Sequence, residues 1–293
     1  MNDLERRALL GVAGVGALAA LSGAVRGAGP LNPPAGAVTG TGRTLDEVYN
    51  KIPAVGSADG RTPIPGGNGP VTISSPGSYV LTGPITGTGA SGISIAADHV
   101  TLDLNGFSVS SAFTTGVGVA IAYGFKGITV RNGLISGFLS GVQVAGSAFN
   151  IVIEDLMVRD SKSIGVQVQS TLARGVVIRR CTIMDTGSTT TTSDGAVNVS
   201  GIASAGSGIL IEQCVIERLF YNGAGGGTMR GIFLNGGTNQ IVRGCSVTAD
   251  NSSLAAPHAG IVMSVPITGI YKDNVVVGFA TKFISGTDGG GNA

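Results

Sequence analysis

The side chains able to bind a sugar gather in three segments in the second half of the chain. These segments, 183–201, 216–231 and 247–260, carry carboxylates, an amide, a guanidinium, an imidazole and a phenol ring. Polar groups of these kinds hydrogen-bond sugar hydroxyls, and an aromatic ring offers a flat apolar platform. The candidate binding residues are Asp185, Asp194, Tyr221, Asn222, Arg230, Asp250 and His258. For any single one of them, an ordinary solvated loop residue is the simpler interpretation.

Catalytic residues are not identifiable from the sequence. General acid–base chemistry and calcium-assisted chemistry both need several groups held within reach of one scissile bond. The two histidines, His99 and His258, stand far apart in the chain, and no acid–base pair accompanies either of them. This pattern favours a binding protein over an enzyme and predicts neither a cofactor nor a metal.

A repeat determines where the three segments lie. An eight-residue frame recurs, with mostly apolar residues at positions one, three and eight and an apolar or small residue at position six. Along a strand every second residue faces inward, but here the inward positions change from odd (one and three) to even (six and eight). Positions four and five must therefore both face outward, which places a corner between them. The rows are Val100–Phe107, Ile128–Ile135, Ile151–Val158, Val176–Ile183, Ile209–Ile216, Gln240–Val247 and Gly269–Val276.

A short strand that begins with glycine precedes each row, as in Gly231–Leu234. A strand, a corner, a second strand and a glycine-opened third strand describe one coil of a parallel β-helix. We therefore expect an all-β fold, a single-stranded right-handed parallel β-helix of about seven to eight coils over residues 70–280. A Gly-rich tail at 281–293 follows it. The three long segments leave equivalent points of consecutive coils, so they are expected to border a groove.

The cysteines fall in one column of the frame. Cys181, Cys214 and Cys245 occupy position six, and the same column holds Asn105 in the first row and Asn274 in the last. A column supplies one ligand per coil in a line, whereas zinc requires four converging ligands. We therefore expect an inward structural stack. A disulfide between stacked neighbours stays open, although an odd number of cysteines leaves one thiol unpaired.

Two outward columns are also ordered. Alternating charges on stacked strands stabilise by about 0.2–1 kcal/mol per pair and fix the register. Position four reads Asp103, Arg131, Glu154, Arg179, Glu212, Arg243 and Lys272. Position two reads Thr101, Thr129, Val152, Val177, Leu210, Ile241 and Ile270. The apolar part of position two, the apolar stripe, needs a cover, either a helix of the same chain or identical chains packed as a homotrimer.

Composition excludes several classes of protein. Of 293 residues, 50 are Gly, none are Trp and 12% are charged, while 43% are hydrophobic. So much apolar area excludes a disordered chain, and so much glycine disfavours a helical bundle. The net charge of +1 gives no basic surface for nucleic acid.

The N-terminal residues 1–28 are typical of a twin-arginine signal peptide. Arg6 and Arg7 precede an uncharged Gly/Ala-rich run, with small residues at Ser22–Ala24 that favour cleavage near residue 24 or 28. An uncleaved membrane anchor is the alternative, since the run just reaches the length of a span. We expect export to the periplasm, the cell surface or the medium, with no membrane span after cleavage. Residues 29–69 read as a Pro/Gly-rich linker that contains a helix at 44–52.

The segments Gly77–Thr82 and His99–Phe107 resemble the opening coils of right-handed parallel β-helix repeat proteins of the pectin-lyase-like superfamily. The resemblance covers residues 61–280 and implies the fold rather than the chemistry, because the superfamily includes lyases, hydrolases, tailspikes and members without assigned activity. Galacturonases of this fold use an Asp-Asp pair, a Gly-His and an Arg-x-Lys segment, all absent here. Pectate lyases cluster calcium-binding carboxylates, whereas the corner carboxylates here alternate with cations.

These observations predict an exported β-helix protein without catalytic activity. It is expected to bind a polysaccharide or a surface protein, or to act as a structural protein at the cell surface. The alternative is a divergent polysaccharide lyase or glycoside hydrolase that uses the same three segments, with calcium as its cofactor.

Overall fold

The computed structural model describes residues 59–89, 91–112, 115–187, 198–221, 227–249, 258–264 and 268–293. The predicted signal peptide, most of the predicted linker and the predicted helix at 44–52 lie outside these residues. Within them every regular element is a β-strand. Accordingly, the described chain contains no helix long and apolar enough to cross a bilayer.

The strands form two sheets in which neighbouring strands run parallel. The nine-stranded sheet contains β3 (Val71–Ile73), β6 (Ser91–Ile95), β9 (Val117–Ile121), β11 (Ser140–Val144), β13 (Ile164–Val168), β16 (Val199–Ser204), β19 (Met229–Leu234), β22 (Ala259–Met263) and β25 (Thr281–Ile284). The seventeen-stranded sheet contains β1 (Thr62–Ile64), β2 (Gly67–Asn68), β4 (Gly77–Leu81), β5 (Ile85–Thr86), β7 (Val100–Asp103), β8 (Ser108–Ser110), β10 (Lys126–Ser136), β12 (Phe149–Arg159), β14 (Arg174–Arg179), β15 (Thr182–Met184), β17 (Leu210–Glu212), β18 (Val215–Glu217), β20 (Gln240–Arg243), β21 (Ser246–Thr248), β23 (Gly269–Lys272), β24 (Val275–Val277) and β26 (Thr287–Asp288).

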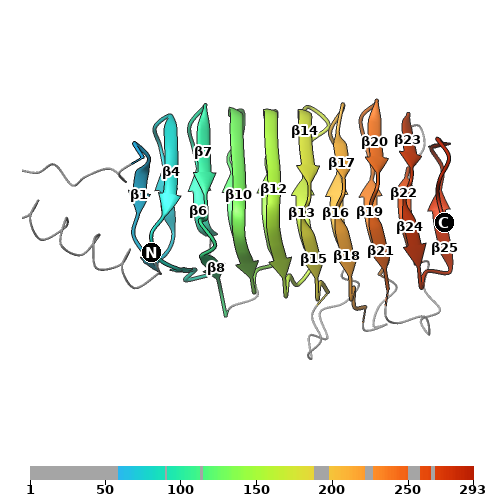
Figure 1. The fold of residues 1–293 in the computed structure, drawn as a ribbon, viewed down its shortest axis with the longest axis horizontal. Helices are drawn as coiled ribbons and strands as arrows, with labels where there is room; N and C mark the ends of the chain where they lie inside the picture. The colour runs from blue at the N-terminus through green and yellow to red at the C-terminus, as the bar shows by residue number, and fades with distance from the viewer. Residues whose placement is uncertain are drawn as a thin grey trace, which may run out of the picture. The chain divides into compact units, whose positions relative to one another are not determined.

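Each coil takes two strand segments from the seventeen-stranded sheet and one strand from the nine-stranded sheet. Strand β14 leads through a corner to β15, the chain crosses to β16, and β17 then pairs with β14 to begin the next coil. In β10 and β12 the strand continues through the corner. Figure 1 shows the coils side by side in sequence order, from blue to red. The predicted coil of a parallel β-helix is confirmed.

The corner residue has a left-handed backbone conformation. Position five of the frame has φ between 51° and 60° at Asn132, Asp155, Arg180, Gln213 and Asp273, and all five residues are exposed. Asn and Asp adopt this conformation more readily than most residues with a side chain. The predicted outward corner is confirmed in these coils.

The glycine at the second or third position of seven strands of the nine-stranded sheet is required by packing. A Cβ atom on Gly231 would lie 2.1 Å from Cγ1 of Val247, and one on Gly118 would lie 2.2 Å from Cγ2 of Ile135. The same close approach to position eight of the frame occurs at Gly141, Gly165, Gly201 and Gly260, and Gly92 approaches Val109, which takes the place of position eight in the first row. Only glycine allows the two sheets to approach so closely at this edge of the core.

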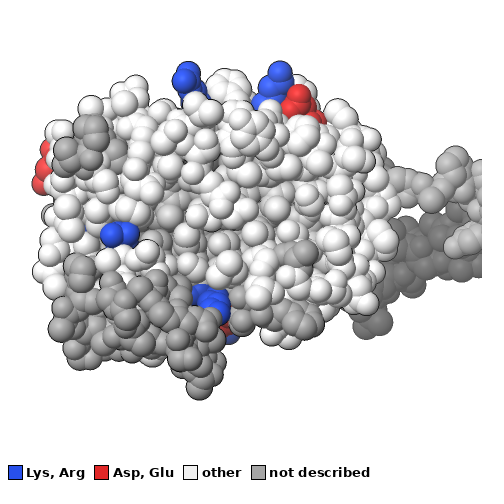
Figure 2. Space-filling model, turned by 180° about the vertical axis from the view of Figure 1, so that it is seen from behind, with Lys and Arg blue, Asp and Glu red and all other residues white. Residues whose placement is uncertain are grey.

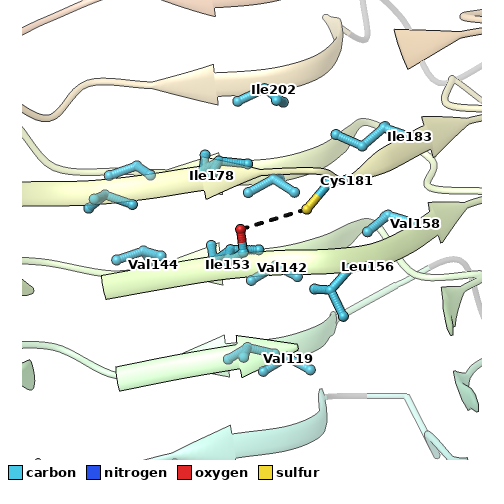
Figure 3. Close-up of a cluster of buried hydrophobic side chains, with 14 of the residues drawn as sticks. Val119, Val142, Val144, Ile153, Leu156, Val158, Ile178, Cys181, Ile183 and Ile202 are labelled. Carbon is cyan, nitrogen blue, oxygen red and sulfur yellow. Dashed lines mark hydrogen bonds between the residues drawn. The ribbon is translucent and has the colours of Figure 1, made fainter. Parts of the chain in front are cut away.

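The three cysteines occupy the inward position directly after the corner in successive coils, where all are buried and free. The Cys181 thiol donates a long hydrogen bond of 3.7 Å to the carbonyl oxygen of Ile153 in the preceding coil (Figure 3). Cys214 and Cys245 repeat this contact with the equivalent carbonyls of their preceding coils. The side-chain amide of Asn274 donates to the next carbonyl of this series, Val242 O, at 3.0 Å. The column therefore supplies a side-chain donor to a carbonyl group in these four coils.

Asn105 does not belong to this column, contrary to the prediction from the frame. Its side chain is exposed, its φ is 51°, and buried Leu104 takes the inward place instead. The first corner is longer than the others, because Val109 rather than Phe107 pairs with Ile135 of the next coil. An eight-residue frame of fixed length does not detect this change of register.

The alternating charges at position four form ion pairs. The closest distances are 3.2 Å for Arg131 to Asp103, 2.7 Å for Arg179 to Glu154 and 2.6 Å for Arg243 to Glu212. Arg180 at position five also binds Glu154, at 3.0 Å. The predicted stack of opposite charges is confirmed in register, but the ion pairs at position four form three separate pairs rather than a continuous ladder, because each carboxylate binds the arginine of the following coil.

The apolar stripe also lies in register. Val152, Val177, Leu210, Ile241 and Ile270 are cross-strand neighbours from one coil to the next. The side chains of Ile241 and Ile270 are 41% and 44% exposed. The stripe therefore lies on the outer surface of the seventeen-stranded sheet.

The helix has more coils than the sequence predicts. Nine strands in one sheet indicate nine coils, against about seven to eight expected. The additional strands lie at the two ends: β1 and β2 precede residue 70, and β25 and β26 occupy 281–288 in the predicted tail. The terminal strands are short and largely exposed, so they lack the apolar alternation on which the prediction depends.

Candidate functional site

The three long segments connect equivalent points of successive coils. Each one leads from β15, β18 or β21, which are neighbours in one sheet, to β16, β19 or β22, which are neighbours in the other. Asp194, Asn222 and Asp250 lie outside the described residues. Asp185, Tyr221, Arg230 and His258 lie at the described ends of the segments.

Asp185 belongs to an ion pair at the first of these segments. Its backbone is left-handed, with φ of 52°, and its Oδ2 accepts a hydrogen bond of 2.6 Å from Nη2 of Arg218 in the next coil. Arg218 has the same left-handed conformation, with φ of 50°. The two side chains thus join the corners of adjacent coils, which is a structural role for Asp185.

Tyr221 is not the exposed platform that the sequence predicts. Its ring is 3% exposed and belongs to the hydrophobic core. Its hydroxyl accepts a hydrogen bond of 2.5 Å from the backbone N–H of Gly227. The ring also packs edge-on against His258, with centroids 5.5 Å apart. An amphipathic tyrosine is buried in this way when its hydroxyl finds a partner.

His258 is a buried, neutral imidazole. Its Nδ1 accepts a hydrogen bond of 3.3 Å from the N–H of Met229, which assigns the proton to Nε2. Burial lowers the pKa of His258. The Nε2 atom has no hydrogen-bond partner within the described chain. The side chain therefore packs beneath the ends of the second and third segments rather than presenting an acid or base to solvent.

Arg230 and Phe233 form a fixed pair on the outer surface of β19. The guanidinium carbon of Arg230 lies 3.8 Å from the centroid of the Phe233 ring, a cation–π contact. Residues three apart in a regular strand face opposite sides. Here Gly231 and Ile232 both face the core, so Arg230 and Phe233 face outward together.

Arg230 has no ion-pair partner among the described residues. Its neighbours across the sheet are Ser200 and Ala259, and the neighbours of Phe233 are Ala203 and Val262. Burial lowers the pKa of Arg230, although a guanidinium remains protonated at neutral pH. An unpaired, partly desolvated cation is costly unless a ligand supplies the negative charge.

The surface around this pair is almost uncharged. The described strands of the nine-stranded sheet contain two charged residues, Arg230 and Lys282. Figure 2 shows a broad face of the molecule with few charged side chains. One outward column contains, in successive coils, Gln143, Gln167, Ala203 and Phe233. The side-chain amide of Gln143 donates a hydrogen bond of 3.1 Å to the amide oxygen of Gln167. We refer to Gln143, Gln167, Arg230 and Phe233 as the sheet surface.

Metal-binding clusters are absent from the residues that the structure describes. No group of three or more His, Cys, Asp or Glu side chains comes close enough there to hold an ion.

Comparison with known proteins identifies the fold but not the activity. No family and no curated protein matches the chain. Among solved structures, the enzymatically active domain of tailspike protein 2 from bacteriophage CBA120 matches with a TM-score of 0.55 and 13% identity, over 75% of this chain and 38% of that one. The chain is a parallel β-helix. This agrees with the fold that the pectin-lyase-like resemblance implies.

A second solved structure is the catalytic domain of a GH87 α-1,3-glucanase in complex with tetrasaccharides, with a TM-score of 0.39 and 12% identity over 78% of this chain and 64% of that one. At such identities a likeness concerns the fold of the β-helix alone. The chain spans well under two thirds of the tailspike domain. The activity of this β-helix must therefore be argued from its own residues.

Proposed function

We propose that the protein is an exported β-helix that binds an acidic polysaccharide on the sheet surface without cleaving it. The single observation that carries the proposal is the guanidinium of Arg230, held on Phe233 without an ion-pair partner in the described chain. The fold's likeness to the enzymatically active domain of a tailspike supports the β-helix as the framework of this surface.

The chemistry of the sheet surface favours a sugar that carries a carboxylate or a sulfate. A guanidinium offers planar, paired donors that match such groups, and its hydrogen bonds to them are charge-assisted. The Gln143 and Gln167 amides supply further contacts suited to hydroxyl groups. Successive strands are about 4.8 Å apart, so a sugar chain that crosses them meets a new outward residue at each coil.

The described candidate residues support binding rather than cleavage. Asp185 is paired with Arg218, and His258 is buried and neutral. Neither is free to transfer a proton to a sugar on the surface.

Export is part of the proposal. The twin arginines and the small residues near Ala24 support translocation by the twin-arginine route and cleavage near residue 24 or 28. Replacement of Arg6 and Arg7 by Lys should retain the precursor in the cytoplasm, and unchanged export of that variant would exclude the route. A mature N-terminus still at Met1 would favour the anchor.

The second candidate function is a divergent polysaccharide lyase or glycoside hydrolase. The fold's likeness to an enzymatically active domain favours it. Its residues would be Asp194 and Asp250, which lie outside the described part, with calcium as the cation they would bind. The apolar stripe supports a further proposal, assembly of the protein as a homotrimer along that surface.

One experiment separates binding from cleavage. The purified mature chain is incubated with acidic and neutral polysaccharides, with and without calcium, while retention, new reducing ends and unsaturated products are followed. We expect retention of acidic polysaccharides with no product. Turnover that disappears in Asp194→Ala or Asp250→Ala would establish the enzyme instead.

A further inference from the structure

One edge of the β-helix carries three exposed apolar side chains. It consists of the turns that lead from the nine-stranded sheet into the seventeen-stranded sheet, each with the first residue of the strand that follows, and we call it the turn edge. Tyr123, Phe149 and Leu172 lie there in three consecutive coils. They are 68%, 54% and 55% exposed, more than any other large hydrophobic side chain of the described residues. Apolar groups gathered in this way on a surface indicate a partner.

These side chains do not serve the core. Ala148, directly before Phe149, takes the inward place in its coil and is fully buried. The ring of Tyr123 lies against the backbone of Gly146 in the following coil, where a Cβ atom would overlap it. The absence of a side chain at Gly146 therefore provides the place on the outer surface that the ring occupies.

Two cations flank Phe149 in its own column. Its cross-strand neighbours are Lys126 in the preceding coil and Arg174 in the following one. Both are exposed, and neither forms an ion pair within the described chain. The one acidic residue among the described residues of the turn edge is Asp98, whose Oδ1 accepts a hydrogen bond of 2.9 Å from the backbone N–H of Lys126. The edge thus has a local excess of positive charge that the net charge of the chain does not reveal.

This combination fits the surface of a bilayer that contains anionic lipid. Aromatic and leucine side chains enter the boundary between headgroups and acyl chains, while Lys and Arg bind the lipid phosphates and keep their stems in the apolar layer. The coils lie side by side (Figure 1), so equivalent turns of consecutive coils are about 4.8 Å apart along one edge. The three apolar side chains are therefore able to meet one flat surface together.

The small size of the apolar patch favours a bilayer over a folded protein partner. A stable protein interface takes about 800 Å² and about 20–30 residues from each side. Here the residues beside the apolar side chains are small and polar, as at Ser147, Ser170 and Thr171. A fluid bilayer requires no complementary shape, so three apolar side chains with two cations are sufficient for weak, reversible attachment.

We propose that the turn edge attaches the protein to an anionic membrane surface, with the three apolar side chains in the interfacial layer and Lys126 and Arg174 on lipid phosphates. The attachment is peripheral and involves no span. The inference goes beyond the proposed function, because no residue of the turn edge belongs to the sheet surface.

The test is sedimentation of the mature chain with vesicles of phosphatidylcholine alone or of phosphatidylcholine and phosphatidylglycerol in equal amounts. The mature chain lacks the signal peptide, so the apolar run of that peptide does not contribute. One double variant, Tyr123→Ser with Phe149→Ser, removes the rings, and another, Lys126→Gln with Arg174→Gln, removes the charges. The controls are Val277→Ser, which removes an exposed apolar side chain of β24, Lys282→Gln, which removes a cation of β25, and Arg230→Ala on the sheet surface.

We expect the chain to bind the mixed vesicles and to bind phosphatidylcholine alone much less. The lipid concentration for half-maximal binding should rise about tenfold or more in each double variant, since a cation near an anionic surface contributes about fivefold and a buried ring at least as much. The three controls should stay within about twofold of the wild type.

A tryptophan probe reports insertion directly. The chain contains no Trp, so Tyr123→Trp introduces a single fluorophore at the turn edge. On the mixed vesicles its emission should shift to shorter wavelength and should be quenched by lipids with brominated acyl chains. Val277→Trp, the matched control, should show neither effect.

The inference is wrong if the chain does not bind the mixed vesicles, or if either double variant binds them as well as the wild type does. Equal binding to the two kinds of vesicle, or a Tyr123→Trp spectrum that lipid does not change, would also overturn it. A dimer in lipid-free solution that Tyr123→Ser with Phe149→Ser abolishes would overturn it by assigning the edge to a second copy of the chain.

Discussion

The central carbon of the Arg230 guanidinium lies 3.8 Å from the centroid of the Phe233 ring. Both side chains face outward because Gly231 and Ile232 between them face the core. The contact limits the rotamers of a long, flexible side chain. Less conformational entropy is therefore lost when Arg230 binds an anionic group.

The contribution of the ring is testable with Phe233→Leu, which keeps an apolar side chain but removes the π-face. A cation–π contact at a partly exposed site contributes about 0.5–1 kcal/mol. We expect the Kd for an acidic oligosaccharide to rise about two- to fivefold. Isothermal titration measures it, with Ile284→Leu in the same outward column as the control. An unchanged Kd would mean that the ring does not position Arg230.

The glycine column predicts a strong effect of one methyl group. In Gly231→Ala the new Cβ would overlap Val247, and overpacking of this kind costs about 1–3 kcal/mol. The midpoint of urea denaturation should fall accordingly. Val247→Ala added to Gly231→Ala should recover part of the loss, because it removes the overlapping methyl groups, although the carbonyl oxygen of Gly260, 2.6 Å from the new Cβ, stays in place. If the two changes instead add without coupling, the explanation by close approach is wrong.

The thiol column predicts inert cysteines. Hydrogen bonds to Cys181 and Cys245, together with burial, raise the pKa of Cys214, whereas the hydrogen bond to Cys214 lowers the pKa of each of the other two thiols. All three side chains are buried, so the reagent does not reach any of them in the folded chain. Iodoacetamide at pH 8 should leave the folded mature chain unmodified and should label all three cysteines after denaturation without reductant. Mass spectrometry counts the labels. Labelling of the folded chain, or fewer than three labels after denaturation, would contradict this prediction.

Acid stability should depend on the Asp155–Arg180 pair. The hydrogen bond from Arg180 holds the pKa of Asp155 below its ordinary value of 3.8. The unfolded chain then binds the proton more readily, so the pair stabilises above about pH 4 and this contribution is lost as the pH falls through the folded pKa.

The variant Asp155→Asn tests the direction in which this contribution to stability changes with pH. The wild type should be the more stable protein above pH 5, and the difference in denaturation midpoint should shrink between pH 4 and pH 2. A difference that stays constant over this range would show that the carboxylate charge is not responsible.

The sequence predicted the coil well because the core imposes a regular requirement. Inward residues must be apolar in every coil, so positions three and eight and the corner between them recur visibly, and Cys181 and Cys214 follow the same register. Asn105 was assigned wrongly because the first corner is longer. The end strands were missed because an exposed strand needs no apolar alternation.

The candidate site was less predictable. Tyr221 is of a type that either stacks on sugars or packs in a core, and only the structure shows that it is buried. Phe233 was not recognised as an outward residue beside Arg230, because strict alternation places residues three apart on opposite faces. The glycine between them was the available signal, since a glycine in a strand often marks a break in the regular pattern.

The most direct test of the account is the affinity of the mature chain for an acidic oligosaccharide, compared between the wild type, Arg230→Ala and Lys282→Ala. Lys282 is the other cation of the nine-stranded sheet and serves as the matched control for loss of charge. The account predicts that Arg230→Ala raises the Kd about tenfold or more, as expected for loss of a charge-assisted contact, while Lys282→Ala changes it less than about threefold, with no cleavage product in any sample. Equal affinities for the wild type and Arg230→Ala, or the appearance of cleaved oligosaccharide, would contradict it.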